Sequence, residues 1–173
     1  MLEEGGKLLK MINNGRSGKV IFLVHCIINS NSICIGPKTP SIWPAMIDEI
    51  IELLMKNKVG IIQLPCPEQA VFGLVRREAS KTQIDTPKFR DYCKKVAESA
   101  VNLIEEYIKN GFKVVGLVGK RGSPTCSVLS EEKGILIEEI INMMNKKKIM
   151  VPLIDFERTE VKECLNKLGE MMI

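Results

Sequence analysis

The 173-residue chain is poor in aromatic residues, in charge of one sign and in long apolar runs. Aromatics make up 5% of the residues, so the core must be built from aliphatic side chains. The 25 Lys and Arg against 21 Asp and Glu leave a net charge of +4, and the basic residues are scattered. A nucleic-acid-binding protein concentrates basic residues on one surface. We therefore expect no nucleic-acid partner.

The sequence also lacks a membrane segment and a targeting segment. Its longest apolar run near the start, residues 20–24, is too short to cross a bilayer, so we expect no membrane association. The first six residues read Met-Leu-Glu-Glu-Gly-Gly, without the basic start and apolar stretch of a secretory signal. We expect a cytoplasmic protein, whose cysteines stay reduced. The length corresponds to one domain.

The six cysteines include no Cys-x-x-Cys pair, although they are numerous for this length. Their spacing excludes a zinc ribbon, a thioredoxin-type site and a ferredoxin run. A chain of this size can bury its own core and needs no disulfide scaffold. The cysteines therefore need a different explanation, which depends on where the fold places them.

Short apolar segments alternate with amphipathic ones along the chain. We predict strands at residues 19–26, 60–64, 112–118 and 149–154, and helices at 43–57, 87–109, 130–148 and around 161–168. The strands show no polar–apolar alternation, which is typical of a parallel sheet covered on both faces. The prediction is α/β: a single-domain three-layer α/β/α sandwich with a mainly parallel, Rossmann-like sheet of about four strands. Residues 1–18 form an N-terminal extension, and 19–173 form the domain.

Polar and sulfur-bearing residues gather where the predicted strands end. His25 and Cys26 end the first strand, and Cys66 and Glu68 follow the second. The third strand leads into a loop that contains Lys120, Ser123 and Cys126, and the fourth leads to Asp155. Since sites in open α/β sheets lie beyond the carboxyl ends of the strands, we expect the three strand-end cysteines to share one edge.

The remaining cysteines suggest packing roles. Cys93 and Cys164 lie on apolar helix faces, and we expect Cys34 to be a buried packing residue in the first loop. Asp155 is predicted to cap the last helix rather than to orient a ligand. Three converging thiolates could hold a soft metal or an iron–sulfur cluster, and a cluster with three cysteine ligands leaves one iron open as a Lewis acid. The residues alone leave open that these cysteines are only small residues in tight turns.

Three motifs together resemble the 2-thiouracil desulfidase (TudS) family, most closely its TudS-related desulfidase branch. They are His25-Cys26, Pro65-Cys66-Pro67-Glu68 and Ser123-Pro124-Thr125-Cys126, in this order on successive strand ends. The resemblance implies a [4Fe–4S] cluster with Cys26, Cys66 and Cys126 as its three ligands. It further implies a desulfidase whose open iron binds the sulfur of a thiolated small molecule, a thiouracil-like base or a related thioamide.

The same resemblance gives Glu68 and Ser123 candidate catalytic roles, in proton transfer and in positioning of substrate or water. His25, Asn29 and Lys120 are candidate substrate-binding residues, Lys120 because a cation in this loop could bind an anionic group. The loops after Cys26 and after Glu68 differ from those of the best-known members, so the resemblance does not specify thiouracil itself as the substrate. A non-catalytic iron–sulfur or sulfur-carrier protein and a metal-free thiol enzyme stay as alternatives.

Overall fold

The computed structural model describes residues 15–37 and 44–172. Its sheet has four parallel strands in the order β2-β1-β3-β4. The strands are β1 (Lys19–Leu23), β2 (Gly60–Gln63), β3 (Lys113–Lys120) and β4 (Leu153–Phe156). The central strands β1 and β3 are buried along almost their whole length, as their unbroken apolar runs predicted.

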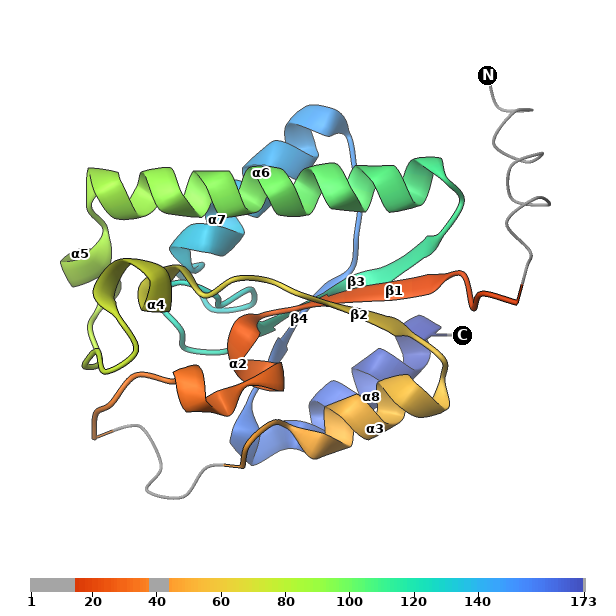
Figure 1. Ribbon diagram of the computed structural model, residues 1–173, viewed down its shortest axis with the longest axis horizontal. Helices are drawn as coiled ribbons and strands as arrows, with labels where there is room; N and C mark the ends of the chain where they lie inside the picture. The colour runs from red at the N-terminus through yellow and green to blue at the C-terminus, as the bar shows by residue number, and fades with distance from the viewer. Residues whose placement is uncertain (1–14, 38–43, 173) are drawn as a thin grey trace.

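Helices cover both faces of the sheet and complete the three layers (Figure 1). One face carries α6 (Pro87–Lys109) and α7 (Ile135–Lys147), which pack against each other. The other face carries α3 (Asp48–Lys56) and α8 (Val161–Met172). The predicted α/β sandwich with a parallel sheet of four strands is confirmed. Residues 1–14 of the predicted extension lie outside the described residues.

The longest helix, α6, begins and ends where the sequence predicted. Pro87 occupies its first turn, and the Thr86 hydroxyl accepts a hydrogen bond from the Phe89 N–H at 3.3 Å. The helix buries Cys93, which has no exposed surface, and α8 buries Cys164 in the same way. These two cysteines are core residues, as predicted.

Several boundaries differ from the prediction. The first strand, expected to run to Cys26, ends at Leu23, because His25 and Cys26 begin the short helix α2 (His25–Ile28). The helix expected from residue 43 begins at Asp48, with Ile47 at its N-cap, and Trp43 lies outside the described residues. The helix expected from Ser130 begins at Ile135 with Gly134 at its N-cap, because residues 128–133 form a loop held by side chains. The fourth strand begins at Leu153, directly after Pro152, and therefore contains Asp155.

Short helices connect the main elements on the carboxyl side of the sheet. They are α2 (His25–Ile28), η1 (Ser30–Ser32), α4 (Pro67–Phe72), α5 (Lys81–Ile84) and η2 (Arg158–Glu160). An isolated parallel bridge pairs Ile35 with Arg77 and joins the first loop to the segment after α4. Over the residues that the structure describes, no helix has the length and apolar character needed to cross a membrane.

Candidate functional site

Three cysteines that follow three different strands line one cavity of about 720 Å³. Cys26 lies in α2 just after β1, Cys66 is the N-cap of α4 after β2, and Cys126 lies in the loop after β3. Because β1 pairs with both β2 and β3, successive crossovers leave it in opposite directions, and such a switch point is where α/β sheets bind ligands. The topology thus brings together the cysteines that the strand-end argument singled out.

The Cys66 sulfur accepts two hydrogen bonds that fix its position. The Gln69 N–H donates to Cys66 Sγ at 3.4 Å, so the thiol caps α4 in place of a hydroxyl. Arg76 Nη2 donates to the same sulfur at 3.5 Å. Pro67 occupies the first helical position and sets the direction in which α4 leaves the strand.

A tight turn holds Cys126. Ser123 Oγ accepts hydrogen bonds from the N–H groups of Thr125 and Cys126, at 3.3 and 3.1 Å. The backbone of this turn packs directly against two glycines. A Cβ added at Gly119 would overlap the Cys126 carbonyl oxygen, and a Cβ added at Gly134 would overlap the peptide bond between Thr125 and Cys126. Ser123 lines the cavity and shapes the cysteine turn at the same time.

Asp155 organises the rest of this loop, which corrects its predicted role as a helix cap. Its Oδ1 accepts from the Val128 N–H at 2.8 Å, and its Oδ2 accepts from the Leu129 N–H at 2.7 Å. The side chain is buried in β4, and Glu157 rather than Asp155 precedes the following helical turn. A buried carboxylate with backbone donors replaces helical hydrogen bonding here, which is why α7 starts after Ser130.

The three cysteines are half-buried, and their thiols lie close enough to influence one another. Burial raises the pKa of Cys26 to about 11, and the neighbouring Cys66 adds to this while Lys120 opposes it. The pKa of Cys126 lies well above its ordinary value, first through burial and then through Cys26 and Cys66. Burial also raises the pKa of Cys66, against the Gln69 N–H and the charge of Arg76.

Glu68 joins two of the cysteine loops. Its Oε2 accepts from Arg76 Nε at 3.1 Å, and its Oε1 accepts from the Thr125 hydroxyl at 2.6 Å. The side chains of Glu68 and Arg76 are 14% and 8% exposed, so this ion pair is largely shielded from water. Each carboxylate oxygen keeps a lone pair, which leaves Glu68 able to accept a further hydrogen bond in the cavity.

The three predicted substrate-binding residues do not all reach the cavity. His25 and Lys120 line it. Burial lowers the pKa of His25, and Arg76 adds to this, so the imidazole is neutral; its Nε2 is buried without a hydrogen-bond partner among the described residues. Asn29 is exposed, accepts a hydrogen bond from Asn31 at 3.1 Å and is not among the lining residues.

The sequence did not predict the contacts of Arg76 and Thr125 in the site, and the prediction that Cys34 only packs in the first loop was wrong. Cys34 is half-buried and lines the cavity, because Ile35 donates its N–H to the Arg76 carbonyl at 2.9 Å and holds the segment at the rim. Arg76 lies in the least regular part of the sequence, where no hydrophobic period predicts which side chains are buried. The Thr125 position inside the Ser-Pro-Thr-Cys motif was the one available signal.

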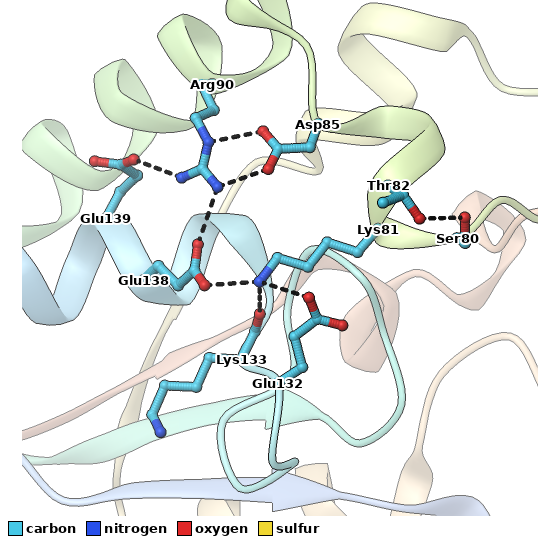
Figure 2. Close-up of polar contacts among 9 residues, drawn as sticks. All are labelled: Ser80, Lys81, Thr82, Asp85, Arg90, Glu132, Lys133, Glu138 and Glu139. Carbon is cyan, nitrogen blue, oxygen red and sulfur yellow. Dashed lines mark hydrogen bonds and ion pairs between the residues drawn. The ribbon is translucent and has the colours of Figure 1, made fainter.

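Figure 2 shows a network of ion pairs, of which Lys81 and Glu132 line the cavity. Lys81 of α5 donates to the Lys133 carbonyl and to Glu138, both at 2.7 Å. Arg90 of α6 binds both carboxylate oxygens of Asp85 at 2.7 Å and reaches Glu138 of α7. These contacts tie α5, α6 and α7 to the loop that precedes α7.

The arrangement is not that of a single-ion site. Within residues 15–37 and 44–172, no group of three or more His, Cys, Asp or Glu side chains is placed to hold a metal ion. The cavity offers four soft sulfur atoms, those of Cys34 and of the three strand-end cysteines. It also offers the shielded Glu68 carboxylate, the His25 imidazole and three cations, Arg76, Lys81 and Lys120.

Comparison with known proteins identifies one archaeal relative. The chain is 36% identical over 144 residues to Uncharacterized protein MJ0003 of Methanocaldococcus jannaschii, a match that covers 83% of this chain and 89% of the relative. The chain belongs to the MJ0003 family. No protein-family model matches the sequence, and no solved structure matches it. The name of this relative states no activity, so the function is argued from the site.

Proposed function

We propose that the chain is an iron–sulfur-dependent, non-redox desulfidase that removes sulfur from a thiolated small molecule. The observation that carries this proposal is that Cys26, Cys66 and Cys126, from three strand ends, line one cavity. The three motifs that resemble the TudS desulfidases contain the same cysteines. A thiouracil-like base or a related thioamide is the proposed substrate class.

The donor set fits a [4Fe–4S] cluster with three cysteine ligands. Thiolates are the ligands that iron–sulfur clusters take, and a cluster is larger than one ion, so its ligands stand further apart than those of a single metal. Burial raises the pKa values of the three thiols and so disfavours their ionisation. A bound iron cation would compensate this cost by stabilising the thiolates. The Gln69 N–H and Arg76 Nη2 donate hydrogen bonds to Cys66 Sγ, and such hydrogen bonds orient a ligand sulfur and stabilise its negative charge.

When bound, the cluster would supply an iron without a protein ligand, which acts as a Lewis acid toward the substrate sulfur. The chain's own residues supply the rest of the chemistry. Water provides the oxygen that replaces sulfur on the substrate carbon, and sulfur leaves as sulfide, so no electrons are exchanged. Glu68 accepts the proton of that water at a carboxylate oxygen within the cavity.

Ser123, Lys120 and His25 orient the substrate. Because Ser123 Oγ accepts from two backbone N–H groups, its own O–H is left to donate to the substrate or to water. Lys120 offers a cation to a polar substituent of the substrate. The neutral His25 presents a hydrogen-bonding ring at the same wall, and Asn29 has no role in this proposal because it lies away from the cavity.

The raised thiol pKa values argue against a metal-free enzyme with a cysteine nucleophile. Such an enzyme lowers the pKa of its thiol with a neighbouring cation or a helix N-terminus. Here the pKa values of Cys26 and Cys126 are raised instead. All six cysteines lie in the described residues and none forms a disulfide there. We propose a cytoplasmic location because that compartment keeps thiols reduced and an oxygen-sensitive cluster intact.

The test is release of sulfide by protein that is loaded with iron and sulfide without oxygen. A panel of thiolated nucleobases and thioamides is incubated with wild-type protein and with the Glu68→Gln and Ser123→Ala variants. We expect sulfide and the oxygen-substituted product in equal amounts from wild type, and a loss of rate of about 10²–10⁴-fold in Glu68→Gln.

Loaded protein that releases no sulfide from any member of the panel would favour the alternative, a non-catalytic iron–sulfur or sulfur-carrier protein. Activity in metal-free protein would instead support a thiol enzyme. The Asn29→Ala variant is the matched control, because Asn29 is a predicted substrate-binding residue that lies outside the cavity. It should release sulfide at the wild-type rate.

A further inference from the structure

Arg76 makes contacts with both a proposed cluster ligand and the proposed proton acceptor. Its Nη2 donates to Cys66 Sγ at 3.5 Å, and its Nε donates to Glu68 Oε2 at 3.1 Å. A third donor, Nη1, lies 3.5 Å from the Gly73 carbonyl. The side chain is 8% exposed, so these contacts compete with little water.

The contacts form a continuous chain between two cysteine loops. Cys66 is bonded to Arg76, Arg76 to Glu68, and Glu68 through its other oxygen to the Thr125 hydroxyl at 2.6 Å. Thr125 directly precedes Cys126. The backbone carbonyl of Arg76 also accepts from the Ile35 N–H, which anchors the Cys34 segment at the cavity rim.

We infer that Arg76 is a positioning residue, which fixes Cys66 and Glu68 relative to each other and raises the reduction potential of the cluster. This inference rests on the proposed function, because it assigns a role toward the same cluster. It adds a residue that the sequence motifs do not contain.

The charges of the site give the reason. Three thiolates and the Glu68 carboxylate would place four negative charges around the cavity, while Arg76 and Lys120 are the cations that act on its thiols. A nearby cation favours the state with one more electron, and an N–H donor to a ligand sulfur acts in the same direction. Loss of Arg76 should therefore make the cluster harder to reduce.

The shape of the guanidinium explains why this position holds arginine. Nε and Nη2 lie on one edge of a rigid plane and serve Glu68 and Cys66 at the same time. A lysine would keep the charge but has a single nitrogen, so it cannot hold both partners in one fixed arrangement. Arg76→Lys should thus retain part of the effect on potential and lose the positioning of Glu68.

The experiment measures the reduction potential of loaded protein for wild type, Arg76→Met, Arg76→Lys and Arg77→Met. Arg77 is the matched control, because it is the exposed neighbour in the same bridge and does not line the cavity. We expect the potential to fall in Arg76→Met, to fall less in Arg76→Lys and to match wild type in Arg77→Met. Sulfide release should slow by about 10–100-fold in Arg76→Met, mainly in kcat.

Equal potentials in Arg76→Met and Arg77→Met would overturn the inference and leave the proposed function intact. If Arg76→Met does not fold, as judged by circular dichroism, Arg76→Lys takes its place in that comparison. Wild-type protein that takes up no cluster would overturn the proposed function and this inference together. A loaded wild type without turnover would contradict only the desulfidase, since the potential still reports on Arg76.

Discussion

Replacement of Gly134 by alanine tests how tightly the Cys126 turn is packed. Gly134 is the N-cap of α7, with φ −68° and ψ 148°, a conformation that any residue adopts. The change therefore adds no backbone strain. Its whole effect is steric, because the new Cβ would overlap the backbone of Thr125 and Cys126.

The size of the effect follows from the backbone nature of that overlap. Backbone cannot rotate away as the end of a side chain can, so the turn or the start of α7 must move. Overpacking of this kind costs about 1–3 kcal/mol. In a chain of this length 1 kcal/mol corresponds to roughly 2–4 °C, which gives a melting temperature lower by about 2–12 °C.

Thermal unfolding of metal-free protein, followed by circular dichroism, measures this change. Gly169→Ala is the control, because Gly169 lies inside α8 with nothing within 4 Å of the added Cβ. Alanine in a helix interior should stabilise it by about 0.5–1 kcal/mol. Iron uptake should also fall in Gly134→Ala and not in Gly169→Ala. If both variants melt above wild type, the reasoning about the Cys126 turn is wrong.

Three further changes test other parts of the structure. Asp155→Asn loses a charged acceptor for two loop N–H groups and should cost about 1–3 kcal/mol in urea unfolding; an unchanged midpoint would contradict this role. Thr125→Val should slow sulfide release with the iron content unchanged, and Thr125→Ser should restore it; equal rates in all three would exclude a role for the hydroxyl. Cys93→Ala should be less stable than wild type at pH 7. Burial raises the pKa of Cys93 to about 12 in the folded protein, so the wild type loses stability as pH rises from about 9 toward about 12. The difference in stability between wild type and Cys93→Ala should therefore shrink over that range. A gap that is independent of pH would contradict that pKa.

Local patterns along the chain were enough to predict the sheet and its main helices. Continuous apolar runs identified β1 and β3, because strands buried on both faces need such side chains throughout. Pro87 marked the start of α6, because proline suits the first turn of a helix. The start of α7 was missed since Ser130 resembles a cap, whereas Asp155, which is 25 residues further on, holds the preceding loop instead.

The site likewise contains residues that the sequence predicts and residues that it does not. The three strand-end cysteines could be grouped because parallel strands bring their carboxyl ends to one edge. Contacts that arise from tertiary structure could not be predicted. Arg76 reaches Cys66 and Glu68 from a segment without periodicity, and Cys34 comes to the cavity through a single bridge at Ile35. Asn29 shows the converse, because it is a predicted substrate-binding residue that the fold leaves outside the cavity.

The iron content of single cysteine variants tests the central claim most directly. Protein is loaded with iron and sulfide without oxygen, and iron per chain is measured for Ser variants of Cys26, Cys66 and Cys126. Cys34→Ser is the matched control, because Cys34 lines the same cavity without being a proposed ligand. We predict about four irons per chain in wild type and in Cys34→Ser, and loss of the cluster in the other three. Colourless wild-type protein, or four variants that behave alike, would contradict the account.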